Sequence, residues 1–246
     1  MLTRYLPIFI ILSIVAEILG TLGGFGSSVF FVPVANFFLD FQSVLGITAL
    51  FHLSSNVTKI AFFKKGLDKK LVLSLGVPAV IFVSIGAYFS KFLDPKVLTY
   101  ILGFFLVGLS LLFLIFKGLA VKPKTKNAII GGALSGLSAG LLGTGGAIRG
   151  ITMAAFKLDK NKFIATSAMI DLGVDFSRTI VYYYNGYMKY EHLYLVAILV
   201  IVGILGTWIG KRILNRMSQD QFRYLVLLLI LGIGIASIVS NLKSFG

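Results

Sequence analysis

Long apolar runs follow one another along the chain and are separated by short polar loops. Ten runs can be outlined, five in each half: 5–22, 25–39, 43–63, 71–90 and 97–117, then 127–143, 146–157, 161–184, 192–213 and 219–241. Most approach the roughly 20 residues that a helix needs to cross a bilayer. The pattern predicts an all-α polytopic membrane protein, because the strands of a membrane barrel would alternate polar and apolar positions.

Two glycine-rich stretches interrupt these runs at corresponding places, Gly20–Gly26 in the first half and Gly140–Gly150 in the second. Glycine accepts left-handed backbone conformations and therefore allows a helix to unwind. Unwound backbone at membrane depth is tolerated only where protein buries it or where it lines a cavity. Runs 25–39 and 146–157 are short and adjoin these breaks, so we expect half-helices or the arms of re-entrant hairpins, and whether they cross fully stays open.

The two halves are related in sequence. The glycine pair at 23–24 recurs at 145–146, an offset of 122. Three polar residues spaced i, i+4, i+7 recur at an offset of 119: His52, Asn56 and Lys59 in the first half, Asp171, Asp175 and Arg178 in the second. We therefore predict two transmembrane repeats, 1–121 and 122–246, within one membrane domain.

Positive charge is distributed unevenly over the loops. If every run reverses direction, one face carries 15 Lys and Arg, in loops 64–70, 117–126, 157–162 and 211–223, and the other face carries 5. The positive-inside rule places the richer face in the cytoplasm. An odd number of runs per half then inserts the repeats in opposite senses, the inverted-topology plan of secondary transporters. Arg4 falls on the outer face in this scheme; if run 25–39 does not turn back as assumed, the N-terminus is cytoplasmic.

Composition agrees with a membrane protein and removes several functional classes. Of 246 residues, 57% are hydrophobic and 13% charged, with mean hydropathy +0.95, whereas soluble domains carry about 25% charged residues. The net charge of +14 lies mainly in the loops and indicates orientation in a bilayer, so we expect no nucleic-acid partner. The chain has no cysteine, which excludes thiol chemistry. We expect no cofactor and no metal.

Charged residues inside the apolar runs are the first candidates for function, because each costs about 2.5–3.5 kcal/mol at a helix centre. We single out six: Glu17, Lys59, Arg149, Asp171, Asp175 and Arg178. The i, i+4, i+7 spacing puts the polar triad of each half on one helix face, and we expect the two faces to meet near the midplane. Asp171, Asp175, Glu17 and His52 are the predicted coupling residues, with Asp171 the acid left free once Asp175 pairs with Arg178. Alternatively, these charges serve only to hold helices together, or the long side chains of Lys59 and Arg178 extend along their helices and place their charged groups at the membrane interface.

Arg149 follows the second glycine pair, where a helix N-terminus would present free N–H groups and a partial positive charge. An arginine beside it can bind an oxyanion through two hydrogen bonds. Ser27 and Ser28 hold the corresponding position in the first half and can donate to the same oxygens. Alternatively, the small residues serve close helix packing. The predicted substrate-binding residues are Gly23, Gly24, Ser27, Ser28, Asn56, Lys59, Gly145, Gly146, Arg149 and Arg178.

We expect no enzymatic activity, because the sequence contains no recognisable constellation of catalytic residues. His52 and His192 lie far apart, and neither belongs to a metal-binding or triad-like local pattern. The stretch Gly20–Gly26 follows an apolar helix instead of a strand, so it is not a dinucleotide fingerprint.

The glycine break at 20–26 followed by Pro33, its echo at 140–150, and the small polar segments 48–56 and 165–168 together resemble the TauE/SafE family of sulfite and sulfonate exporters. The resemblance covers nearly the whole chain, including its duplicated layout. It implies transport of sulfite, sulfoacetate or a related sulfur anion. It also implies that the glycine breaks and the Thr/Ser segments form the transport core.

We therefore predict a secondary transporter of a small anion, working by alternating access as a multi-pass protein of the cell membrane. Coupling would come from an ion or substrate gradient, because the chain has no ATP-binding motif. The expected partners are the anion and the lipid bilayer, and a homo-oligomer is compatible with the sequence. The alternatives are an ion-coupled cation carrier that uses the same carboxylates and a membrane scaffold subunit that does not transport.

Overall fold

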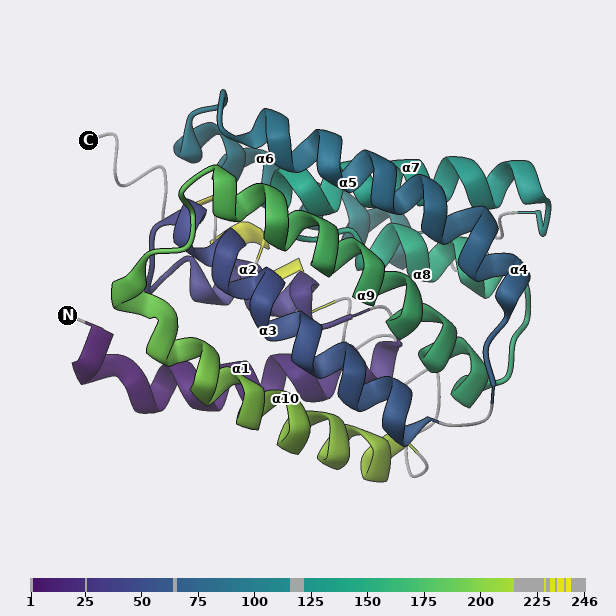
Figure 1. Cartoon of the computed structure of the whole chain (residues 1–246), viewed down its shortest axis with the longest axis horizontal. Coiled ribbons are helices and arrows are strands. Elements are labelled where there is room, and N and C mark those ends of the chain that lie inside the picture. Colours follow the sequence, from purple (N-terminus) through teal and green to yellow (C-terminus); the bar gives the residue numbers. More distant parts are fainter. Residues whose placement is uncertain are drawn as a thin grey trace.

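The computed structural model describes residues 2–24, 26–63, 66–115 and 122–214, with isolated residues between 228 and 239. Within these residues the chain forms helices and no strand (Figure 1). The predicted all-α class is therefore confirmed. Of the predicted run 219–241, only isolated residues between 228 and 239 are among the described residues.

The helices follow the predicted runs closely. The first half contains α1 (Leu2–Gly23), α2 (Ser28–Ala35), α3 (Phe41–Phe62), α4 (Lys69–Leu71), the π-helical turn η1 (Val72–Gly76), α5 (Val77–Ser90) and α6 (Pro95–Ile115). The second half contains α7 (Thr125–Leu142), α8 (Gly146–Ala154), α9 (Lys160–Tyr184), the 3-10 turn η2 (Tyr190–His192) and α10 (Leu193–Leu214). Four stretches among the described residues are long and apolar enough to cross a membrane: Arg4–Gly23, Lys69–Ser90, Pro95–Leu112 and Tyr190–Leu214.

The helix between Lys69 and Ser90 changes geometry in its middle. Pro78 has no N–H, so the carbonyl of Ser74, four residues earlier, lacks its usual helical partner. The wide turn of η1 lies where that bond is missing, which is how a π-helical turn accommodates a break in the regular ladder.

The two glycine stretches do interrupt helices. Gly24 and Gly26 between α1 and α2 have φ of +69° and +92°, and Gly143 after α7 has φ of +75°, conformations that favour glycine. The helices that follow, α2 and α8, have 8 and 9 residues. Helices of that length rise about 12–14 Å, less than half of a hydrocarbon core about 30 Å thick. Neither short helix spans a bilayer by itself.

The long polar helices α3 and α9 begin in the same way. The Asp40 carboxylate accepts a hydrogen bond from the backbone N–H of Ser43 (3.0 Å), and Asp159 accepts one from Lys162 (3.0 Å). Both are N-caps of the kind that satisfies a free donor in the first turn. The two caps differ by 119 residues, the offset that relates the polar triads.

The halves are interleaved. Helix α1 packs along α10, α5 along α7, and α3 along α9, as Figure 1 shows. Glycine allows the first two contacts: a Cβ at Gly206 would lie 2.7 Å from the Cβ of Glu17, and one at Gly86 would lie 2.6 Å from the carbonyl oxygen of Leu137. Each half therefore completes the packing of the other.

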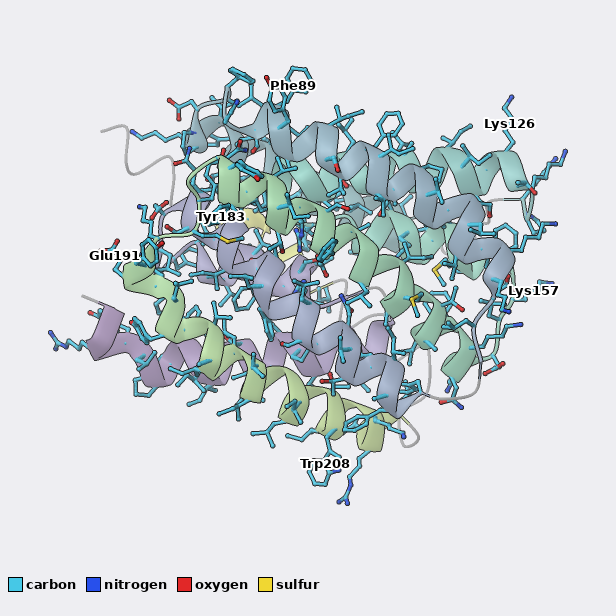
Figure 2. All side chains as sticks on the ribbon, in the orientation of Figure 1. Phe89, Lys126, Lys157, Tyr183, Glu191 and Trp208 are labelled. Carbon is cyan, nitrogen blue, oxygen red and sulfur yellow. The ribbon has the colours of Figure 1, made fainter. Side chains whose placement is uncertain are left out.

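Hydrogen bonds also join distant segments at two opposite ends of the long helices. At one end Lys211 Nζ donates to the carbonyl of Phe62 (2.7 Å), and Thr166 accepts from the backbone of Asp68 (3.0 Å). At the other end Lys189 Nζ contacts Asp40 (2.9 Å). Figure 2 shows Lys126 and Lys157 at the end opposite Glu191. This arrangement agrees with a lysine-rich face and a poorer one.

Candidate substrate site

The six charged residues of the apolar runs form three buried ion pairs, Lys59–Glu17, Arg149–Asp171 and Arg178–Asp175. Their side chains are 14% exposed or less. Each pair joins one cation to one carboxylate, so the three positive charges cancel the three negative ones.

Glu17 is the centre of a hydroxyl-rich cluster. Its carboxylate accepts hydrogen bonds from Ser27 (2.5 Å), Ser55 (2.5 Å) and Thr207 (3.0 Å), and Lys59 Nζ lies 2.7 Å away. His52 Nε2 lies 3.0 Å from Ser27 Oγ. Because the Ser27 hydroxyl gives its single proton to Glu17, the network assigns His52 Nε2 as the donor. The predicted coupling residues Glu17 and His52 are therefore linked through Ser27.

Asp175 lies where the two triads meet. Asn56 Nδ2 donates to one carboxylate oxygen of Asp175 (2.7 Å), and Arg178 Nε donates to the other (2.8 Å). Asn56 and Asp175 are equivalent at the 119-residue offset, and α3 packs against α9. The faces of the two triads are therefore in contact, as we expected from the relation between the halves.

Arg178 also holds the end of α7. Its Nη1 donates to the carbonyl oxygens of Gly143 (2.8 Å) and Ala139 (3.3 Å), and the Tyr182 hydroxyl donates to that of Gly140 (2.8 Å). The last carbonyls of a helix have no partner within the helix. Arg178 and Tyr182 supply those partners where the second glycine break begins.

Arg149 faces Asp171 with both ends of its guanidinium group. Nη1 and Nη2 each donate to one oxygen of Asp171, and Nε donates to Ser167 Oγ (3.1 Å). The prediction that Asp171 is a free acid is therefore wrong. The partner comes from α8, a different helix, and the spacing of residues along α9 could not reveal it.

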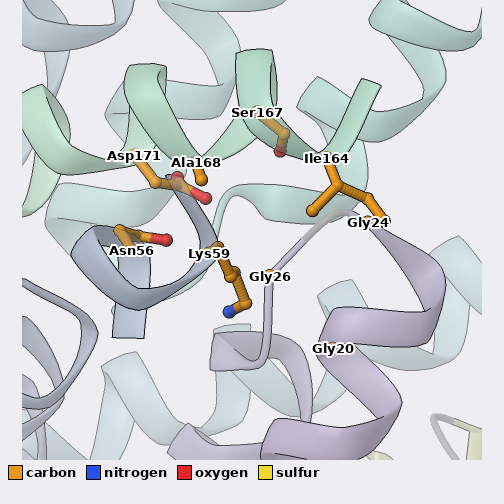
Figure 3. Close-up of a pocket in the computed structure, with 9 residues that line it drawn as sticks. All are labelled: Gly20, Gly24, Gly26, Asn56, Lys59, Ile164, Ser167, Ala168 and Asp171. Carbon is orange, nitrogen blue, oxygen red and sulfur yellow. The ribbon is translucent and has the colours of Figure 1, made fainter. Parts of the chain in front are cut away.

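A small pocket lies between the first glycine break and α9 (Figure 3). It is lined by Gly20, Gly24, Gly26, Asn56, Lys59, Ile164, Ser167, Ala168 and Asp171. A Cβ at Gly26 would lie 3.4 Å from both Arg149 Nη2 and Asp171 Oδ2. The unwound backbone of the first half therefore covers the ion pair of the second half.

The remaining predicted residues lie around this pocket in other roles. Ser28 Oγ donates to Thr144 (3.3 Å), and Ser27 donates to Glu17, so neither serine donates to the carboxylate that Arg149 holds, and their contact with an anion stays a prediction. A Cβ at Gly145 would clash with the carbonyl of Ser135, as the alternative of close helix packing requires. Gly23 is the last residue of α1, and Gly146 is the first of α8.

Sequence reasoning missed several partners of the charged groups. Ser55 and Ser167 lie in the small polar segments that carry the family resemblance, but nothing singled them out there. Tyr182 follows Arg178 by four residues and is fully buried, so helical spacing contained a signal for it. Thr207 lies on α10 and has no such local signal.

Comparison with known proteins extends this picture. The family model described as Sulfite exporter TauE/SafE matches residues 9–237. A protein of Methanocaldococcus jannaschii with the name "Probable membrane transporter protein" is 27% identical over 256 positions, which cover 93% of this chain and 93% of that protein. No solved structure matches.

Proposed function

This chain belongs to the sulfite exporter TauE/SafE family, and from that premise we propose that it is a secondary transporter of a small sulfur oxyanion or organosulfonate. Family membership and the name of the relative point to a membrane transporter rather than to an enzyme. The long apolar helices fit a multi-pass protein, for which we propose the cell membrane.

One observation supports an anion as the substrate. Arg149 is 2% exposed and lies in the first turn of α8, with its two Nη groups on a pair of carboxylate oxygens and Nε on Ser167. A sulfite or sulfonate group presents the same pair of oxygens and adds a third. Asp171 thus occupies the position that such an anion would take on a guanidinium fork.

The ion pairs also bear on the alternative of a cation carrier. Each of the three buried carboxylates in the described ranges already holds a protein cation. A transported cation would have to displace a tethered lysine or arginine. An anion would likewise have to displace a carboxylate, so our choice of the anion rests on the guanidinium fork of Arg149 and on the family.

Alternating access rests on the relation between the halves. We interpret 1–121 and 122–246 as inverted repeats. When the two repeats exchange their conformations, the pocket would open to the opposite side of the membrane. Two contacts support this: Asn56 meets its equivalent Asp175, and the α1–α10 contact corresponds to the α7–α5 contact when the halves are exchanged. Interrupted helices at the centre are the usual site of such transporters.

Thermal unfolding of the purified protein tests the function. Sulfite, sulfate and methanesulfonate are compared with chloride as sodium salts at equal ionic strength, and the oxyanions should raise the midpoint by mass action. Arg149→Gln should weaken oxyanion binding about 10- to 100-fold, because hydrogen bonds to charged groups contribute about 1.5–3 kcal/mol. Arg212→Gln is the control, because Arg212 lies over the Trp208 ring (4.1 Å) on the surface. Unchanged affinity of Arg149→Gln for every anion would contradict the site.

Single cysteines test the inverted topology. The chain has no cysteine of its own, and Lys124 and Lys189 are both exposed. We expect Cys at 124 to label only from the cytoplasmic side and Cys at 189 only from the opposite side. Labelling of both by an impermeant reagent from one side would contradict the inverted repeats.

A further inference from the structure

An anion that enters this site meets a centre whose charges already cancel. The three buried cations each hold a carboxylate, and the pocket is lined by both Lys59 and Asp171. An added anion would leave one uncompensated negative charge in a region that water solvates poorly, which is strongly unfavourable. Binding therefore requires that one carboxylate give up its cation or its charge.

The three carboxylates differ in how firmly they are held. Glu17 is fully buried and bound by a lysine and several hydroxyls, and Asp175 is bound by both Arg178 and Asn56. Asp171 has Arg149 as its hydrogen-bonding partner, is 14% exposed, and alone of the three lines the pocket described above. Asp171 is the carboxylate that an incoming anion can replace.

We propose that each substrate monoanion displaces Asp171 from Arg149 and that Asp171 takes up one proton from water as it is released. This inference rests on the proposed function. The proton neutralises the carboxylate, Arg149 keeps its charge, and the anion takes over the guanidinium fork and the Ser167 hydroxyl. The empty site and the loaded site then have the same net charge.

The surroundings of Asp171 fit this exchange. The charged groups that face it are Arg149 from α8, Lys59 from α3, and Asp175 and Arg178 on its own helix. On the other side, Val80 of α5 packs against Gly173, and the Ile170 side chain packs against Gly76 of η1, so these elements contribute apolar contacts. With Lys59, Asp175 and Arg178 engaged in their own pairs, the proton on Asp171 compensates the anion.

The same charge balance defines the substrate class. One proton compensates one negative charge, so the site fits a monoanion such as an alkylsulfonate or hydrogen sulfite. A dianion such as sulfate would leave one negative charge uncompensated and should bind less well. Transport of a monoanion with one proton moves no net charge.

Calorimetry with methanesulfonate tests the exchange, because the charge of this anion does not change between pH 5 and pH 9. Titrations of the purified protein at pH 8, in two buffers of different ionisation enthalpy, should give close to one proton taken up per anion. Over the range where Asp171 is ionised, affinity should fall about tenfold for each unit rise in pH, as linkage of one proton requires. In proteoliposomes, an inward proton gradient should drive uptake, and an imposed potassium diffusion potential should not.

Two variants separate this exchange from a merely structural ion pair. Asp171→Asn should bind methanesulfonate at pH 8 at least tenfold more tightly than the wild type, without proton uptake and with no pH dependence. Asp159→Asn removes the exposed acid that caps the same helix, far from the three buried pairs and outside the pocket, and it should keep both the proton uptake and the pH dependence.

The results distinguish the inference from the function on which it rests. Wild-type protein that binds methanesulfonate without proton uptake would overturn the exchange and leave anion transport standing. An Asp171→Asn variant with the full pH dependence of the wild type would do the same. Failure of both methanesulfonate and sulfite to bind at any pH would overturn the proposed function and the inference together. The wild-type titration decides the matter even if Asp171→Asn does not fold.

Discussion

The polar centres of the two halves use equivalent positions for different chemistry. Ser27 corresponds to Arg149 at the 122-residue offset, and His52 corresponds to Asp171 at the 119-residue offset. In the first half His52 lies 3.0 Å from Ser27 in a hydrogen bond, whereas in the second half the corresponding contact is the Arg149–Asp171 ion pair. The same two positions meet in both halves, but only the second half has a cation on its short helix.

The last residue of each triad, Lys59 or Arg178, also has a different partner in the two halves. Lys59 pairs with Glu17 of α1 (2.7 Å), while Arg178 bonds the carbonyl of Ala139 in α7. Ala139 is the residue that corresponds to Glu17 at the 122-residue offset. The first half therefore holds a carboxylate saturated by hydroxyls, and the second half holds an ion pair whose carboxylate, Asp171, lines the pocket. The comparison teaches that the two halves share the positions that are in contact, while the residue types at these positions separate structural support from the substrate binding that we propose.

The largest expected effect tests the support around α7. Arg178→Gln leaves Asp175 without its cation and removes two bonds to carbonyls of α7. We expect a loss of roughly 3 kcal/mol in unfolding free energy, the lower end of the range for broken buried pairs, because polar contacts in membranes measure less. Lys59→Gln should lower the free energy of unfolding by clearly less, since Glu17 keeps its hydroxyl donors. Thermal unfolding of both variants in detergent shows which one loses more stability. Equal losses would contradict the different roles that we assign to Lys59 and Arg178.

Replacing Ser27 or Ser167 tests whether the first half supports the structure and the second half binds the anion, and the expected effects are smaller. Ser27→Ala removes the link between His52 and Glu17 and should lower stability by about 1 kcal/mol with anion affinity unchanged. Ser167→Ala removes the partner of Arg149 Nε and should lower oxyanion affinity about fivefold, equivalent to about 1 kcal/mol. Binding titrations and unfolding of both variants form the measurement. If Ser27→Ala weakened binding as much as Ser167→Ala, the roles would not be divided.

The smallest expected effect concerns the caps of α3 and α9. Burial raises the pKa of the Asp40 carboxyl, but hydrogen bonds from Lys189 and Ser43 outweigh burial, so this pKa lies below its ordinary value. A carboxyl with a lowered folded-state pKa stabilises the protein above about pH 4, its ordinary pKa, and loses that contribution as pH falls further. Because Asp40 is 45% exposed, we expect at most about 0.5 kcal/mol.

The measurement is the unfolding midpoint between pH 6 and pH 3. Wild-type protein should lose slightly more stability on acidification than Asp40→Asn. Asp159→Asn is the matched control, because Asp159 caps α9 in the same way through the backbone N–H of Lys162. Parallel pH profiles of the wild type and Asp40→Asn would show that the Lys189 contact contributes nothing.

The sequence predicted those features that depend on neighbours within one helix. Apolar runs located α3 and α9, paired glycines located both breaks, and the i+3 spacing predicted the Asp175–Arg178 pair. It did not predict the Arg149–Asp171 pair, because the two residues lie 22 positions apart on different helices. The contact depends on how α8 is oriented relative to α9 after the break at Gly145. A periodic sequence pattern contains no information about that tertiary arrangement.

The packing of α1 along α10 has a consequence for how the protein is made. Thr207, a hydrogen-bonding partner of Glu17, is synthesised 190 residues after it. When α1 leaves the ribosome, Glu17 is an uncompensated polar group, and it gains Lys59 and Ser55 only once α3 has been inserted. Helix α5 similarly awaits α7. The polypeptide that carries only the first half is therefore an unfinished intermediate, in which buried polar groups such as Glu17 still lack partners that the last helices supply.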